Sequence, residues 1–122
     1  MIAFQNVSKD YGVDSAALTD VTFKIDDNEF VSLVGHSGAG KTTVVKMILG
    51  EEKPTKGTVF FESVNIHTLR AKKLALFRRK IGVIFQDFRL IPSKTAYENI
   101  AFAMEAAGRS DEEIAADVPD VL

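Results

Sequence analysis

The chain has 122 residues, the length of a single domain with room for a hydrophobic core. Its hydrophobic fraction of 46% and charged fraction of 26% are those of an ordinary soluble globular protein, and a net charge of −2 gives no reason to expect nucleic acid as a partner. The chain has no cysteine, which excludes disulfides and thiolate metal sites, and no apolar run approaches the length of a membrane span.

Two strands are predicted near the start of the chain, and they look antiparallel. Apolar side chains within 1–7 indicate a short first strand, and 8–15 reads as a polar turn region that contains Tyr11. The second strand is predicted over 18–26, where polar residues alternate with Val21, Phe23 and Ile25. Such alternation is typical of a strand with one buried and one wet face.

A glycine-rich loop follows a third apolar stretch. Residues 30–34 are predicted to form a buried strand, and 44–49 to form an apolar helix that stops at Gly50. Between them, 35–42 reads Gly-His-Ser-Gly-Ala-Gly-Lys-Thr, which fits the phosphate-binding pattern of Gly, four residues, and Gly-Lys-Ser/Thr. A strand, a glycine loop and a helix in this order are the context that the motif requires.

The residue types of this loop suit a bound phosphate. Gly35, Gly38 and Gly40 can turn successive N–H groups toward one anion, and the start of the helix adds its positive dipole end. Lys41 would place its ammonium on phosphate oxygens, and the hydroxyl of Thr42 would ligate Mg²⁺. The alternative is a glycine-rich turn that ends in Gly-Lys-Thr by chance.

Four further segments are predicted before residue 95. They are a strand over 57–61, a turn over 63–66, a helix over 69–80 and a buried strand over 81–85; the side chains of the helix expected to face inward are Leu69, Leu74, Leu76 and Phe77. Gln86 and Asp87 close that last strand, and residues 88–94 are predicted to form a loop.

Two capping boxes predict two helices at the end of the sequence. Thr95 with Glu98 starts the first helix, which Gly108 ends, and its Tyr97, Ile100, Ala101 and Met104 form a core-facing stripe. A second box in 110–113 starts a helix that we expect to end around Pro119.

This arrangement resembles the first half of an ABC-type ATPase nucleotide-binding domain. The resemblance is carried by 4–11, by the loop 35–43 and by 78–87, and the loop form with His36 is similar to that of the FtsE group of cell-division ATPases. It implies an α/β fold, a P-loop NTPase core with an N-terminal antiparallel β-subdomain. The expected division is 1–30 mainly β-subdomain, 31–94 P-loop core up to the Q-loop, and 95–122 start of the helical subdomain.

The resemblance also implies roles for single residues, with ATP and Mg²⁺ as cofactors. Tyr11 occupies the place of the aromatic side chain that stacks on adenine, and Gln86 that of the Q-loop glutamine, which reaches Mg²⁺ and the attacking water. Thr42 and Gln86 are the implied metal ligands. The nucleotide-binding residues implied are Tyr11, Gly35, His36, Ser37, Gly38, Ala39, Gly40, Lys41, Thr42 and Thr43. The alternatives are a turn tyrosine without a ligand and a loop glutamine bonded to backbone.

The family also implies partners. Residues Phe88 to Phe102 would face an integral membrane protein similar to FtsX, the parent protein would be a homodimer, and its location would be peripheral, on the cytoplasmic face of the plasma membrane. The sequence stops before the family's Leu-Ser-Gly-Gly-Gln signature, its second acidic strand with the catalytic Glu and its switch histidine, so no catalytic set is complete. We therefore expect this chain to bind nucleotide without hydrolysing it, and to self-associate through the apolar edge that truncation exposes.

Two other functions remain open. One is the equivalent half of an ATPase that serves an ABC exporter or importer. The other is a different P-loop enzyme, a small kinase or a GTPase. The GTPase is disfavoured because the guanine-reading pattern Asn-Lys-x-Asp is missing: residues 55–58 read Thr-Lys-Gly-Thr.

Overall fold

The structure is a computed structural model that describes residues 1–12 and 16–122. The chain forms two compact units, Met1–Arg78 and Arg79–Leu122. Of the turn predicted over 8–15, residues 8–10 are instead the end of the first strand, and residues 13–15 lie outside the described part. Within that part, no helix is both long enough and apolar enough to cross a membrane.

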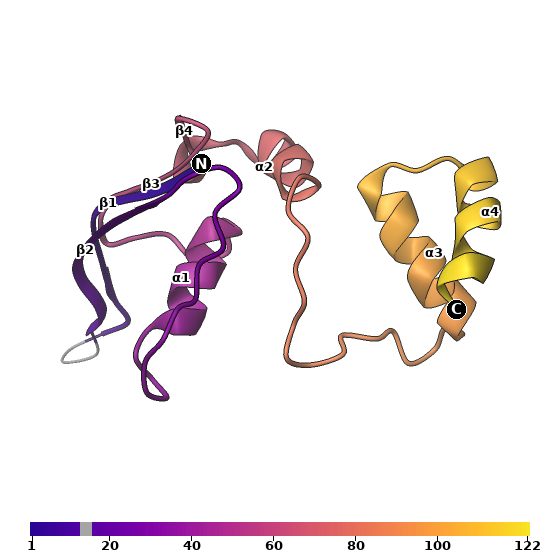
Figure 1. The fold of residues 1–122 in the computed structure, drawn as a ribbon, viewed down its shortest axis with the longest axis horizontal. Coiled ribbons are helices and arrows are strands. Elements are labelled where there is room, and N and C mark those ends of the chain that lie inside the picture. Colours follow the sequence, from indigo (N-terminus) through magenta and orange to yellow (C-terminus); the bar gives the residue numbers. More distant parts are fainter. Residues whose placement is uncertain (13–15) are drawn as a thin grey trace. The chain divides into compact units, whose positions relative to one another are not determined.

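The first unit is built on a four-stranded antiparallel sheet (Figure 1). Its strands are β1 (Ile2–Asp10), β2 (Ala16–Ile25), β3 (Lys56–Phe61) and β4 (Val64–Asn65), in the order β2-β1-β3-β4. The two predicted N-terminal strands are thus confirmed as an antiparallel pair, in which Phe4 lies opposite Phe23. On its other side Phe4 lies opposite Val59 of β3, so the sheet combines strands from both sides of the glycine loop.

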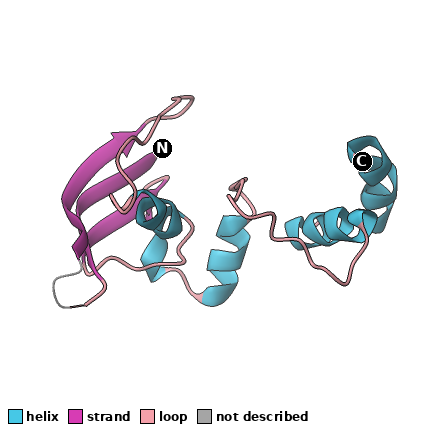
Figure 2. Cartoon of the chain, turned by 90° about the horizontal axis from the view of Figure 1, so that it is seen from below, coloured by secondary structure: helices cyan, strands magenta, loops and turns pink. Residues whose placement is uncertain are grey.

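One helix covers a face of this sheet. Helix α1 (Lys41–Ile48) lies beside the sheet in both ribbon views (Figures 1 and 2). Its Val44 and Met47 are buried, as are Phe4, Val7 and Val59 of the sheet. Together these buried side chains form the core of the unit. Their burial removes apolar surface from water and so stabilises both the sheet and the helix.

The segment after β4 differs from its prediction. A 3-10 helix, η1 (Ile66–Thr68), follows the short strand β4, where only a turn was expected, and α2 (Ala71–Arg78) is shorter than 69–80. Phe77 is buried as predicted, with its ring centroid 5.1 Å from that of Phe61. Leu76 does not face inward and is half exposed. Neighbouring positions on a helix point about 100° apart, so Leu76 points away from the face that buries Phe77.

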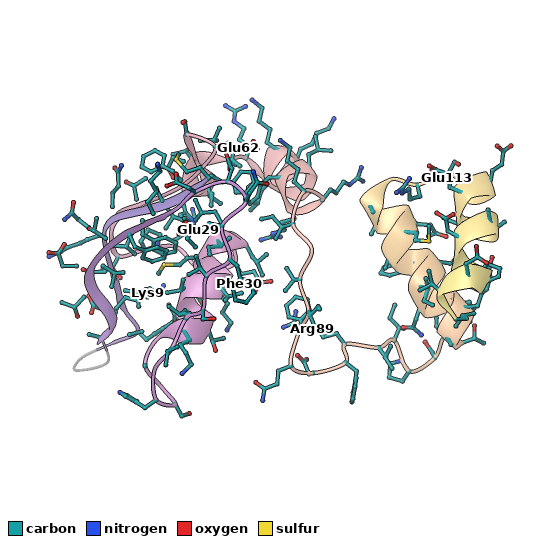
Figure 3. The ribbon with its side chains drawn as sticks, viewed as in Figure 1. Lys9, Glu29, Phe30, Glu62, Arg89 and Glu113 are labelled. Atoms are coloured by element: carbon teal, nitrogen blue, oxygen red, sulfur yellow. The ribbon has the colours of Figure 1, made fainter. Side chains whose placement is uncertain are left out.

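The two strands predicted as buried are not formed. Residues 30–34 belong to no strand, and Phe30, labelled in Figure 3, is 93% exposed. Residues 81–85 are likewise unpaired, and the side chain of Ile84 is fully exposed. A strand requires a neighbour for its N–H and C=O groups. Among the residues described here, neither segment has such a neighbour within its own unit.

The second unit is a helical hairpin of α3 (Ala96–Ala107) and α4 (Asp111–Val121). Both predicted capping boxes are formed, and Gly108 ends α3 with φ = 90°. The side chains that α4 buries are Ile114 and Val118. The predicted stripe on α3 is only half-buried at best, and Tyr97 is exposed. Among the described helices and strands, α4 is the main element packed against α3.

Helix α4 also passes its predicted end. It continues two residues beyond Pro119, to Val121. Proline removes one N–H donor, but its fixed φ is compatible with a helix, so a single proline near the end of a helix can be tolerated.

Candidate nucleotide-binding site

The glycine loop forms a compact turn ahead of α1. The N–H of Ala39 donates to the carbonyl of His36 at 3.1 Å, and Gly38 and Gly40 both have φ = 82°. A Cβ atom on Gly40 would lie 2.4 Å from the carbonyl oxygen of Ala17, on β2. Two features therefore require glycine at position 40: its positive φ, and the close approach of β2, which leaves no room for a Cβ atom.

Lys41 is folded back over the loop. Its Nζ donates to the carbonyl oxygens of Gly35 and His36, each at 2.6 Å. An ammonium has three N–H donors and no acceptor, so these two bonds leave one donor for a ligand. The positive charge is thereby held at the mouth of the loop by the loop's own backbone, beside the first free N–H groups of α1.

The ring of His36 bonds within the loop. Its Nδ1 lies 2.7 Å from the carbonyl oxygen of Ser37. A carbonyl only accepts, so Nδ1 is the donor of this hydrogen bond. His36 is exposed, and this hydrogen bond stabilises the turn.

Tyr11 stands next to the start of α1. Its hydroxyl lies 3.4 Å from Oγ1 of Thr43, a long contact, and Thr43 is the buried polar residue of the first turn of the helix. Tyr11 is 51% exposed, which leaves ring surface for a ligand. The structure therefore brings together the predicted aromatic residue and the predicted phosphate loop, which are 24 or more residues apart in sequence.

A lysine that the sequence analysis did not single out supports Tyr11. The Nζ of Lys9 lies 4.9 Å from the centroid of the Tyr11 ring. The same Nζ forms an ion pair with Glu52 at 3.0 Å and donates to the carbonyl of Lys53 at 2.9 Å. The available signal was the i, i+2 spacing of Lys9, near the end of β1, and Tyr11, which directly follows the strand.

The two predicted metal ligands lie in different units. Thr42 is exposed on the first turn of α1, whereas Gln86 is exposed in the second unit, so the role of Gln86 stays a prediction. In the described residues, no group of His, Cys, Asp or Glu could hold a metal ion. A hydroxyl on Mg²⁺ is compatible with that finding, since a phosphate-bound Mg²⁺ keeps most of its ligands from phosphate and water.

The site as built can hold a polyphosphate next to an aromatic platform. The loop supplies turned backbone N–H groups and the Lys41 ammonium, and α1 supplies its positive end. These donors fit a phosphate chain, and Tyr11 fits a planar base.

Comparisons with known proteins point the same way. The family model described as ABC transporter matches residues 18–121. The chain is 45% identical over 122 residues to the cell division ATP-binding protein FtsE of Bacillus subtilis, with 54% of that protein covered. It is also 47% identical, over 113 residues, to the methionine import ATP-binding protein MetN 2 of Lactiplantibacillus plantarum, with 90% of this chain and 33% of that protein covered.

Solved structures agree with the sequence matches. A dimeric ATP-binding cassette in a post-hydrolysis state, bound to ADP and Pi, superposes with a TM-score of 0.86 at 35% identity. That match covers 98% of this chain and 55% of the other. A second structure, of a dimeric bacterial ABC transporter cassette, gives a TM-score of 0.84 at 39% identity, with 93% of this chain and 52% of the other covered. The chain thus spans about half the length of the FtsE relative and of these two cassettes.

Proposed function

The chain belongs to the ABC transporter family, and on that premise we propose that residues 35–43 bind the phosphates of ATP while Tyr11 stacks on its base. The observation that carries the proposal is the position of Lys41, whose ammonium is held over the loop by the carbonyls of Gly35 and His36 with one donor left. A glycine-rich turn without a binding role would not require a cation, two glycines at positive φ and the start of a helix at the same place.

Mg²⁺ fits the same site through Thr42, which is exposed at the start of α1. When bound, Mg²⁺ neutralises phosphate charge and orients the phosphate oxygens. Gln86 is the second proposed ligand. The work of this chain's own residues is to bind and orient the nucleotide, and hydrolysis is proposed for the whole protein, which is about twice as long in the FtsE relative.

The proposal is tested by calorimetry of Mg-ATP binding to the full chain and to Lys41→Ala. Charge-assisted bonds from an ammonium to phosphate support a loss of affinity of about 100-fold or more. Lys46→Ala is the matched control, because Lys46 lies on the last turn of the same helix, away from the loop. Equal affinity of the chain and of Lys41→Ala would show that the loop is not the site.

The finer proposal is that the parent protein works with a membrane partner in cell division, as an FtsE-like ATPase with an FtsX-like partner on the cytoplasmic face of the membrane. It is supported by the FtsE names among the relatives and by exposed apolar side chains in 88–102, where Phe88 is 92% exposed and Phe102 is also exposed. Exposed apolar side chains are typical of contact surfaces. The methionine-import relative supports an importer ATPase as the second candidate.

A binding experiment distinguishes the two candidates. Proteoliposomes that carry an FtsX-like protein, or instead an import permease, are sedimented with the chain. We expect retention by the first kind only, and weaker retention of Phe88→Asp. Leu122→Asp is the control, because Leu122 is an exposed apolar residue that lies outside 88–102. Retention by the permease alone would favour the importer.

A further inference from the structure

We propose that Lys9 is a positioning residue for base recognition: its ammonium holds one face of the Tyr11 ring, so that the opposite face is presented to the purine of the nucleotide. The inference rests on the proposed function, because it concerns the same site. It adds a residue that lies outside the phosphate loop and identifies how the aromatic platform is fixed.

The first step is the contact itself. The Nζ of Lys9 lies over the ring of Tyr11, 4.9 Å from its centroid. Cations within about 6 Å of an aromatic centroid are attracted by the negative face of the ring, and more strongly where water is excluded. The Lys9 side chain is only 14% exposed, whereas Tyr11 is half exposed. One face of the ring is therefore covered by a sheltered cation, and ring surface remains open to a ligand.

The second step is that Lys9, labelled in Figure 3, is itself fixed. Its Nζ is held by the carboxylate of Glu52 at 3.0 Å and the carbonyl of Lys53 at 2.9 Å. A lysine side chain loses considerable rotamer entropy when it is held in one conformation. Here folding has already ordered the side chain, so nucleotide binding does not have to order it. The ring is thus oriented in advance of binding.

The third step is where those anchors come from. Glu52 and Lys53 lie in the segment that follows α1, and the same segment is tied to β1 by two further bonds. The N–H of Thr55 donates to the carbonyl of Ser8 at 2.8 Å, and the N–H of Asp10 donates to Oγ1 of Thr55 at 3.1 Å. Helix α1 therefore serves the nucleotide at both ends: its start carries Lys41, and the segment after it holds Lys9.

The experiment uses the full chain with Tyr97→Phe as background. The chain has two tyrosines and no tryptophan, so Tyr11 is then the sole fluorescent side chain of its kind. Mg-ATP and Mg-tripolyphosphate are each titrated. ATP should quench Tyr11, whereas tripolyphosphate, which has no base, reports the loop alone by calorimetry.

The variants are Lys9→Met, which keeps the apolar stem, Lys9→Arg, which keeps the cation, and Glu52→Gln, which weakens the anchor. Lys9→Met should bind ATP about three- to fivefold more weakly and bind tripolyphosphate as before. Lys9→Arg should restore most of the difference, and Glu52→Gln should show a smaller loss for ATP only. Lys24→Met is the matched control, because Lys24 is an exposed lysine of β2 paired with Asp26.

Each result decides the matter. Unchanged ATP affinity and quenching in Lys9→Met would overturn the role of Lys9 while leaving the phosphate site intact. An equal loss for ATP and tripolyphosphate would also overturn it, because it would indicate general damage to the fold. Failure of the background chain to bind either ligand would instead overturn the proposed function.

Discussion

Alanine substitutions at two glycines of the loop distinguish the cost of backbone strain from the cost of a steric clash. Gly38 and Gly40 share φ = 82°, but only Gly40 has neighbours where a Cβ would stand, with the carbonyl oxygen of Ala17 at 2.4 Å. We predict that Gly38→Ala lowers the free energy of unfolding by about 1–2 kcal/mol, the cost of a left-handed residue with a Cβ. Gly40→Ala should cost about 3 kcal/mol or more, because β2 must also move. Equal losses in denaturant unfolding would contradict the close approach of β2 to the loop.

A half-buried histidine in the first unit predicts a pH dependence of stability. Burial, and then the charges of Lys53 and Lys9, lower the pKa of His67, whose Nε2 has no hydrogen-bond partner. The unfolded chain, with an ordinary pKa of about 6.5, then takes up a proton more readily than the folded chain. Stability that is present above this value should be lost as the pH falls below it.

The measurement is the free energy of unfolding at about pH 7.5 and 5.5. We expect the decline to be smaller in His67→Gln. His36→Gln is the matched control, because that histidine is exposed in the loop and should leave the decline unchanged. A decline that is identical in both variants would assign it to other groups.

At the scale of elements, the helical hairpin depends on its two capping boxes. In each box a hydroxyl accepts from a backbone N–H, and a glutamate carboxylate accepts from the backbone of the cap residue. Thr95→Ala should therefore cost about 1 kcal/mol of helix stability, and Thr95→Ser should recover most of it. Helical circular dichroism during thermal unfolding measures both variants. An equal loss in both would show that the hydroxyl is not what stabilises the start of α3.

The same boxes give the hairpin an acid limit. Hydrogen bonds from Thr95 lower the pKa of Glu98, and those from Ser110, with Arg109, lower the pKa of Glu113. A carboxyl group whose folded pKa is lowered contributes stability above its ordinary pKa, and that contribution is lost as the pH falls through the folded value. The helical signal should therefore hold to about pH 5 and weaken below about pH 4. A Glu98→Gln, Glu113→Gln variant should weaken less over this range.

What the sequence could predict follows from how local each signal is. The capping boxes, the stop at Gly108 and the alternation in 18–26 depend on neighbours within a few residues, and all were confirmed. The apolar runs 30–34 and 81–85 were read as buried strands, but a strand also needs partners that are distant in sequence. The pairing of β3 with β1 and the contact of Lys9 with Tyr11 likewise depend on tertiary structure, so periodicity alone could not reveal them.

At the scale of the whole molecule, the α/β fold of an ABC-type ATP-binding cassette is confirmed. The nucleotide site in the loop 35–43 was predicted from its sequence pattern and stays a prediction. The predicted division at residues 30 and 94 stays a prediction. The sheet takes β3 and β4 from the range assigned to the P-loop core, because a β-subdomain can be completed by strands that return from later in the chain.

Exposed apolar side chains predict that this chain self-associates. Phe30 and Val34 of the unpaired stretch are almost fully exposed. Unpaired backbone that carries exposed apolar side chains favours association with another chain. We expect light scattering at tens of micromolar to detect species larger than a monomer, fewer of them in Phe30→Ser with Val34→Ser, and no increase with Mg-ATP. A monomer at this concentration, or association only with ATP, would contradict the prediction.

The central claim is that nucleotide binds at the loop 35–43 beside Tyr11. It is tested most directly by amide NMR spectra of the full chain titrated with Mg-ADP. The account predicts that the largest shifts arise at the glycines of the loop, at Lys41 and at Tyr11, while amides of α4 stay in place. Shifts that cluster outside this loop, or that persist unchanged in Lys41→Ala, would contradict it.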